Sequence, residues 1–399
     1  MKVRLKLEDN FMQENKCCGC GACVQICPQQ CINFIENERG FLVPNIDYDR
    51  CIKCGCCKNV CPEITNRLEF NDVEKAYAVV SKDLDVLKKS TSGGMFVFLA
   101  EKIIKMNGVV FGAAWGENHD LSHIMIDKIE NLSKLMKSKY VQSNTKNTFK
   151  EAKEALDKNI FVLYSGTACQ IAGLKMYLNK DYLNLYTVEV ACHGVPSIGL
   201  FKKYIEWREK QNNSKVIECT FRTKDKHQGG EHYKLKMSFE NGKTKYFHFQ
   251  KDPYYNAFIN GVSIRKTCYD CKYKKERRIA DFTLCDFWGI EKVKKDFPAN
   301  HGVSAVLINS KKAKELFNDI SKKICFEEVT KKSVYSHNKS LISSCSKKNS
   351  EKFDTLSFDS DLLFKKIMMK LSWISKFKIV IKEFVPEKIL YYLRRVWRK

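Results

Sequence analysis

The sequence lacks a long hydrophobic run near its amino-terminal end, where residues 1–10 alternate charged and apolar side chains. This pattern predicts neither a secretion signal nor a membrane-spanning helix, and it favours a short strand over Lys2–Leu7. Without an export signal, we expect the protein in the reducing cytoplasm, where disulfides are rare. The 19 cysteines among the 399 residues therefore indicate metal binding.

Acidic residues are also scarce, because 46 Asp and Glu stand against 70 Lys and Arg, which gives a formal net charge of +24. The lysines are scattered and no nucleic-acid recognition motif accompanies them, so we expect no nucleic-acid partner. A basic surface can instead attract acidic redox proteins, phosphorylated cofactors or an anionic membrane. A lysine-rich genome is an equally good explanation of the charge.

Two copies of the pattern C-x2-C-x2-C-x3-C-P occupy residues 17–62. This is the spacing of bacterial two-cluster ferredoxins, in which three cysteines hold one 4Fe-4S cube and the fourth crosses to the other. A zinc site would need two C-x2-C pairs farther apart, so zinc is disfavoured. Cys18, Cys31 and Cys56 fall outside the pattern and are interpreted as bystanders. The predicted ligands are Cys17, Cys20, Cys23 and Cys61 for cluster one, and Cys51, Cys54, Cys57 and Cys27 for cluster two.

Apolar runs beyond the cysteine repeat predict a body of strands and helices. Strands over Ile160–Tyr164 and Leu185–Val190, with a helix from Ile171 between them, indicate a βαβ unit. Asn241-Gly242 predicts a hairpin, and Thr145 is expected to cap a helix that runs through Leu156. Further strands are expected at 76–81, 109–115, 124–129, 216–221 and 303–308.

A second group of cysteines lies in this body. Cys169 and Cys192 each close a loop after a predicted parallel strand, and Cys268 and Cys271 form a C-x2-C pair. Three or four such thiolates could hold a third 4Fe-4S cluster, with Cys285 as a competing fourth ligand. The alternative is that the isolated members are ordinary buried cysteines. Cys219, Cys325 and Cys345 are interpreted as structural.

A loop of small residues precedes an apolar helix that starts at Met95. Its backbone N–H groups, its hydroxyls and the positive end of the helix dipole suit an anion such as a pyrophosphate. Small-residue helix starts are common, so the loop alone is a weak signal. The candidate binding residues are Ser90, Ser92, Gly93 and Gly94.

Together, these motifs resemble those of the coenzyme F420 hydrogenase/dehydrogenase beta-subunit family. The resemblance covers about residues 75–310, and a fused ferredoxin module is a familiar companion of this family. Two departures are Ala168, where the family usually has proline, and Cys285, where it usually has glycine. The stretches that carry the resemblance are Ser90–Gly94, Ser165–Leu174, Cys192–Ser197, and Cys268–Cys271 with Ala280–Gly289.

The resemblance implies FAD and an inner 4Fe-4S cluster. FAD would lie against the Ser90–Gly94 loop and against Lys139 and Tyr140. The inner cluster would be held by Cys169, Cys192, Cys268 and Cys271.

From these cofactors we expect an oxidoreductase that passes single electrons from its clusters to FAD and on to a two-electron acceptor. The acceptor would be an organic substrate or a deazaflavin coenzyme, and relatives encoded with glycan-biosynthesis enzymes suggest a link to that process. A redox partner protein or reduced ferredoxin would exchange electrons with the chain. His193 and Asp286 are the candidates for moving the accompanying proton. The alternative is a non-catalytic electron-transfer subunit of a larger complex.

The expected fold class is α+β: a small ferredoxin-like two-cluster module, then a mixed α/β flavin and iron–sulfur body, then a basic helical tail. Lysines interrupt every apolar run of the tail from Leu362 onward, so it should not span a bilayer. It could lie on an anionic membrane surface, or it could dock on its own domain or on a partner. The expected domains are 1–68, 72–157, 158–325 and 326–399.

Overall fold

The computed structural model describes residues 14–65, 67–224, 234–299, 301–358 and 362–367, so the strand predicted over Lys2–Leu7 lies outside the described residues. The chain divides into two compact units according to its internal contacts. The first unit comprises residues 1–136, 141–200 and 264–347, and the second comprises residues 137–140, 201–263 and 348–399.

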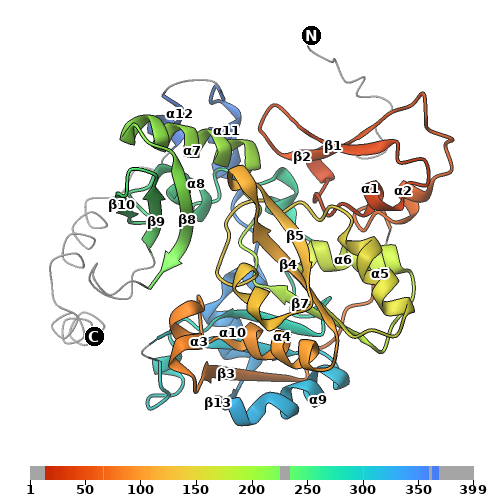
Figure 1. Cartoon of the computed structure of the whole chain (residues 1–399), viewed down its shortest axis with the longest axis vertical. Coiled ribbons are helices and arrows are strands. Elements are labelled where there is room, and N and C mark those ends of the chain that lie inside the picture. Colours follow the sequence, from red (N-terminus) through yellow and green to blue (C-terminus); the bar gives the residue numbers. More distant parts are fainter. Residues whose placement is uncertain (1–13, 66, 225–233, 300, 359–361, 368–399) are drawn as a thin grey trace. The chain divides into compact units, whose positions relative to one another are not determined.

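The cysteine repeat folds into a small module within the first unit (Figure 1). Its helices α1 (Ala22–Ile26) and α2 (Cys56–Asn59) each follow a glycine with positive φ, 85° at Gly21 and 76° at Gly55. Because glycine has no Cβ, this left-handed conformation is accessible to it, and both cysteine loops can turn sharply into a helix. Between the repeats, β1 (Ile32–Glu36) and β2 (Leu42–Ile46) pair antiparallel.

A mixed eight-stranded sheet forms the centre of the first unit, in the order β13-β3-β12-β11-β7-β6-β4-β5. Neighbours among β11, β7, β6 and β4 run parallel, and all pairs outside this group are antiparallel. The predicted segments 72–157 and 158–325 both contribute strands to it. The strands are β3 (Lys75–Ser81), β4 (Val109–Trp115), β5 (Leu121–Ile126), β6 (Val162–Thr167), β7 (Leu185–Val190), β11 (Phe282–Asp286), β12 (Ser304–Ile308) and β13 (Ile324–Val329).

Helices cover both faces of this sheet. Successive residues of a strand point to opposite faces, so neighbouring residues pack against different helices. In β4, Val110 shares an apolar core with α4 (Met95–Lys105) and α9 (Lys311–Ile320). Its neighbour Phe111 shares another core with α5 (Thr148–Asp157) and α6 (Ala168–Leu178). The core that contains Phe111 also contains Cys18, Cys20 and Ala22 of the cysteine module. The module is therefore anchored on the α5 and α6 side of the sheet.

Helix α6 connects the parallel strands β6 and β7, which confirms the predicted βαβ unit. Thr167 and Gln170 form a capping box at its start. The cap predicted for α5 is wrong, because that helix starts after Asn147 without a side-chain cap. The hydroxyl of Thr145 instead donates to the carbonyl oxygen of Cys20 at 2.9 Å, and so ties the body to the module.

The second unit has its own sheet and an aromatic core. The predicted hairpin at Asn241-Gly242 is confirmed by the antiparallel pairing of β9 with β10, and β8 pairs on the other side of β9. Tyr204 and Tyr254 stack with ring centroids 5.2 Å apart, and Arg208 forms a buried ion pair with Asp252 at 2.7 Å. The elements are β8 (Val216–Thr223), β9 (Lys234–Phe239), β10 (Thr244–Phe247), α8 (Pro253–Ile259), most of α7 (Ile198–Asn212), α11 (Ser350–Asp354) and α12 (Leu363–Ile367).

The expected fold class is confirmed, since a ferredoxin-like module precedes a mixed α/β body. Beyond residue 358, the described part of the predicted basic tail includes only residues 362–367, which contain α12, and the rest of that prediction lies outside the described residues. Among the described helices, none has the length and apolar character needed to cross a membrane.

Candidate functional site

The four cysteines predicted to hold cluster one, here called set one, line a single cavity in the module. Cys17, Cys20 and Cys61 are buried and Cys23 is half-buried. Cys23 lies on α1, directly after the turn at Gly21, and Cys61 follows α2. The packing of α1 against α2 therefore brings Cys61, the fourth cysteine of the second repeat, next to the first three cysteines of the first repeat. Set one consists of Cys17, Cys20, Cys23 and Cys61.

The chemistry of set one fits an iron–sulfur cluster. Burial raises the pKa of Cys61 to about 11 and that of Cys23 well above the ordinary thiol value, and the other cysteines add to the effect. Buried thiolates therefore need positive charge at their centre, which the irons of a cube would provide. Among the described residues, no three His, Cys, Asp or Glu side chains are grouped as ligands of one metal ion.

The cysteines predicted for cluster two, here called set two, lie nearer the solvent. Cys54 is exposed, whereas the other three are half-buried. The Cys27 sulfur is 3.4 Å from that of Cys31, and Cys31 also interacts with Cys51. Cys31, interpreted from sequence as a bystander, is thus a direct neighbour of this set. Set two consists of Cys51, Cys54, Cys57 and Cys27.

The four cysteines of the body, here called the inner set, also come together. Two of them follow neighbouring parallel strands, since Cys169 lies in the first turn of α6 after β6 and Cys192 follows β7. Burial raises the pKa of Cys192 to about 12, and Cys169 and Cys271 raise it further, while Lys274 lowers it. The pKa of Cys271 is raised to about 11, again chiefly by burial. The inner set consists of Cys169, Cys192, Cys268 and Cys271.

Cys18 connects two of these sets. Its buried thiol interacts with Cys169 of the inner set and with Cys20 of set one. The position was missed in the sequence because the spacing pattern has no place for it. In contrast, Cys285 donates to the Ala305 carbonyl oxygen at 3.7 Å, and its electrostatic neighbours are Asp286 and Arg278 rather than the inner set.

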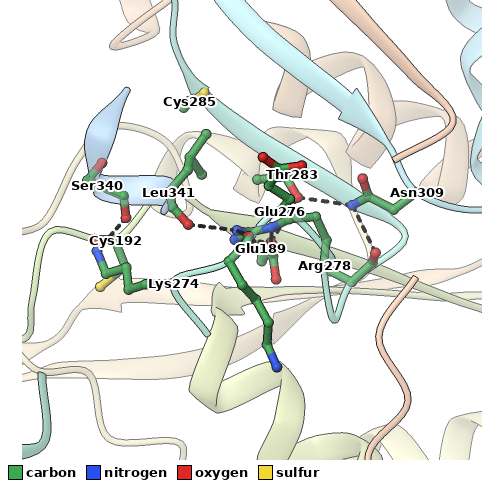
Figure 2. A network of polar contacts seen from close by, with 12 residues as sticks. Glu189, Cys192, Lys274, Glu276, Arg278, Thr283, Cys285, Asn309, Ser340 and Leu341 are labelled. Atoms are coloured by element: carbon green, nitrogen blue, oxygen red, sulfur yellow. Dashed lines mark hydrogen bonds and ion pairs between the residues drawn. The ribbon is translucent and has the colours of Figure 1, made fainter. Parts of the chain in front are cut away.

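A segment near residue 340 borders the inner set. The Ser344 hydroxyl accepts a hydrogen bond from the backbone N–H of Cys271 at 3.1 Å. The Lys274 ammonium donates to the carbonyl oxygens of Cys192 and Ser340, as Figure 2 shows. The same lysine acts electrostatically on Cys345, whose sulfur lies 3.3 Å from Nε2 of His193. These contacts could not be read from local sequence patterns, because they join segments far apart in the chain.

A buried polar network supports the strands that end at the inner set (Figure 2). Glu189 of β7 forms an ion pair with Arg278, and both side chains are almost completely buried. Thr283 of β11 donates to Glu189 at 2.8 Å, and Asn309 donates to Thr283 at 3.0 Å. Arg278 also donates to the Leu341 carbonyl oxygen at 3.0 Å. The network therefore joins the strand ends to the segment near residue 340.

The predicted FAD residues are divided between the two units. In the first unit, the Ser92 hydroxyl donates to the Val303 carbonyl oxygen at 2.7 Å, and the Gly93 N–H donates to the Ser304 hydroxyl at 3.0 Å. These two groups hold the loop against the sheet, whereas the buried Ser90 hydroxyl has no partner among the described residues. Gly94, with φ of 87°, precedes α4.

Lys139 and Tyr140 belong to the second unit. Burial lowers the pKa of Lys139 to about 7, and the charge of Lys137 lowers it further. The Tyr140 ring lies 4.7 Å from the ring of Phe258, and its carbonyl oxygen accepts a hydrogen bond from the Tyr254 hydroxyl at 2.7 Å. This pair thus combines an aromatic surface with an amine that is easily deprotonated.

The candidate proton-transfer residues follow neighbouring strands. His193 comes three residues after the end of β7, and Asp286 is the last residue of β11, which runs parallel to β7. Both residues are half-buried at the same edge of the sheet. Their role in proton transfer stays a prediction.

Comparison with known proteins identifies two regions of the chain. Residues 161–333 match the model of the carboxy-terminal region in the beta subunit of coenzyme F420 hydrogenase/dehydrogenase. Residues 16–64 match the model of a 4Fe-4S dicluster domain. No curated protein sequence matches the chain.

Among solved structures, the fold is similar to a chain from the xenon-derivatised F420-reducing NiFe hydrogenase complex of Methanosarcina barkeri. The two are 16% identical, the match covers 68% of this chain and 91% of the other, and the TM-score is 0.45. The two family matches confirm the motif-based assignment: residues 16–64 match a 4Fe-4S dicluster domain, and residues 161–333 match the carboxy-terminal region of the coenzyme F420 hydrogenase/dehydrogenase beta-subunit family.

Proposed function

We propose that this chain is an iron–sulfur flavoprotein oxidoreductase with three 4Fe-4S clusters and FAD, which carries single electrons to a two-electron acceptor. The observation that carries the proposal is the position of Cys18, which interacts with Cys20 of set one and Cys169 of the inner set. Two cofactor sites that are separated by one buried side chain suit one-electron transfer. We therefore propose that set one and the inner set hold successive clusters of one electron-transfer pathway.

The exposure of the sets supports an entry point at set two. Cys54 is exposed, whereas Cys17, Cys20 and Cys61 of set one are buried. A redox partner protein or reduced ferredoxin would therefore meet the chain at the Cys54 loop. The net charge of +24 would favour an acidic partner through electrostatic attraction.

FAD, when bound, accepts electrons singly and releases them as a pair, and so links the clusters to a hydride acceptor. The unpartnered hydroxyl of Ser90 has hydrogen-bonding capacity that a bound cofactor could use. His193 and Asp286 are proposed to hold and move the accompanying proton at the strand ends. The residues proposed to hold FAD are Ser90, Ser92, Gly93, Gly94, Lys139 and Tyr140.

The acceptor is proposed to be an organic substrate or a deazaflavin coenzyme, and a link to glycan biosynthesis is proposed from the sequence resemblance. A second candidate function is an electron-transfer subunit without its own substrate, which is favoured by the beta-subunit description of the matching family. Reduction of a small molecule by the isolated chain would support the enzyme, and activity only with a second polypeptide would support the electron-transfer role.

The proposed location is the cytoplasm, with the tail from Leu362 a candidate for contact with an anionic membrane.

Iron, acid-labile sulfide and flavin should be quantified on one anaerobically purified sample. About twelve irons and one FAD per chain are expected for three cubes and a flavin. About eight irons without flavin would contradict the inner cluster and the flavin. A Cys169→Ser variant should lose about four irons, whereas Cys219→Ser should lose none, because Cys219 is buried in the second unit and belongs to none of the three sets.

A further inference from the structure

An arginine of the body lies buried against the cysteine module. The Arg265 side chain is 2% exposed, and its guanidinium donates to the carbonyl oxygen of Cys17 at 3.2 Å. It also donates to the carbonyl oxygen of Leu42 at 2.6 Å and to the Gln142 side chain at 2.8 Å. These contacts join the first cysteine loop, β2 and the body. The guanidinium is therefore held in one position beside set one.

Two features of Arg265 are unusual for a purely structural residue. Its Nε–H is buried and has no hydrogen-bond partner among the described residues. Its charge forms no ion pair with a carboxylate in the described part of the chain, although Glu63 lines the cavity of set one. An unpaired buried donor and an uncompensated buried charge are both costly. Negative charge and sulfur acceptors next to Arg265 would remove both costs.

Set one would supply that partner when its cluster is bound. Four thiolates and the sulfides of a cube carry net negative charge, and their sulfurs accept hydrogen bonds from N–H groups. Reduction adds a further negative charge, so a fixed cation beside the cluster favours the reduced form. The effect is strongest in a buried site, where solvent and salt screen the interaction between the two charges only weakly. Set two, with its exposed Cys54, lacks that protection from solvent.

We propose that Arg265 is a positioning residue that raises the reduction potential of the cluster held by set one, through its fixed charge and its Nε–H. The inference rests on the proposed assignment of that cluster. It gives the two clusters of the module different potentials, although their cysteine spacing is the same. Electrons that enter at set two would then be drawn toward the buried set one and the body.

The test is a redox titration, monitored by electron paramagnetic resonance, of full-length protein purified anaerobically. In Arg265→Gln, the equilibrium constant for reduction of one cluster should fall about tenfold, which corresponds to a shift of about 59 mV to lower potential. The matched control is Arg277→Gln, which removes the same charge from a residue whose side chain is 59% exposed, and it should leave all potentials unchanged. Unchanged potentials in Arg265→Gln with full iron content would overturn the proposal.

A second measurement decides the case if Arg265→Gln loses its cluster. Wild-type protein labelled with 15N at the arginine guanidinium groups would be reduced and studied by pulsed electron paramagnetic resonance. A hyperfine coupling between an arginine nitrogen and one reduced cluster is expected, because Nε–H would donate to a sulfur of the bound cluster. The absence of any such coupling would refute the inference. Wild-type protein with no bound iron would instead refute the proposed function.

Discussion

Gly173 of α6 faces Cys20 so closely that a Cβ atom at this position would lie 2.9 Å from the Cys20 sulfur. The same atom would lie 2.8 Å from Cys20 Cβ and 3.3 Å from the Phe149 ring. Real Cβ contacts are longer, so either the helix or the cysteine loop would have to move. The lack of a side chain at Gly173 is therefore what lets the body approach set one this closely.

We predict that Gly173→Ala impairs cluster one. Alanine is intrinsically better than glycine in a helix interior by about 1 kcal/mol, but overpacking a tight core costs about 1–3 kcal/mol. The expected result is a lower unfolding temperature and a loss of up to about four irons per chain. Gly116→Ala is the control, because a Cβ there meets only the Asp120 carbonyl oxygen at 3.7 Å. Equal iron content in the two variants would contradict the prediction.

We predict that Lys274→Met loosens the segment near residue 340. The ammonium donates to the carbonyl oxygens of Cys192 and Ser340, and a hydrogen bond from a charged group contributes about 1.5–3 kcal/mol. Limited proteolysis should cut the variant faster within residues 338–347 than the wild type. Lys88→Met serves as the control, since Lys88 lies outside this segment, is largely exposed and forms an exposed ion pair with Asp85. The same cleavage rate in both variants would argue against this role of Lys274.

The sequence predicted the local parts of the structure well. The apolar runs located β4 and β7 at their observed bounds, and Asn241-Gly242 located the hairpin of β9 and β10. Such features depend on residues a few positions apart, and their side-chain pattern is enough to predict them. The cysteine spacing is of the same kind, because three ligands in one tight loop need only local geometry.

The residues that support the site were missed because their roles depend on distant contacts. Arg265 reaches Cys17 across 248 positions, and Thr145 reaches Cys20 across 125. Thr145 was interpreted as a helix cap because its sequence neighbourhood favours one, yet its hydroxyl donates to the Cys20 carbonyl oxygen of the module instead. Cys18 is similar, since only the folded chain brings it to Cys169. No pattern within a single segment could have indicated these pairs.

We predict that Arg278→Met strongly destabilises the first unit. It leaves the Glu189 carboxylate buried without its cation, and breaking a buried pair in this way costs about 3–5 kcal/mol. Chemical denaturation should show a clearly lower free energy of unfolding. Glu328→Gln is the control, because it breaks the exposed pair with Lys75 and should leave stability unchanged. If Arg278→Met is as stable as the control, the network does not support the strand ends.

Lys139 should be a reactive half-buried amine near neutral pH. Burial lowers its pKa to about 7, so at pH 8 most of its side chain is the neutral nucleophile. An amine-reactive reagent at pH 8 should therefore modify Lys139 before the exposed Lys137, as peptide mass spectrometry would show. Prior incubation with FAD should slow the modification if Lys139 contacts the flavin. Slower labelling of Lys139 than of Lys137 would contradict the lowered pKa.

The lowered pKa of Lys139 also predicts that the stability of the protein depends on pH. The ordinary pKa of a lysine is 10.5, so between about pH 7 and 10.5 the unfolded chain binds more protons at Lys139 than the folded chain does. The Lys139 contribution to the free energy of unfolding therefore increases as pH rises through this window and is constant below it. Lys139→Met removes this contribution, so its unfolding free energy should rise less steeply than that of the wild type between pH 7 and 9. Parallel curves for the two proteins would show that Lys139 keeps its ordinary pKa in the folded state.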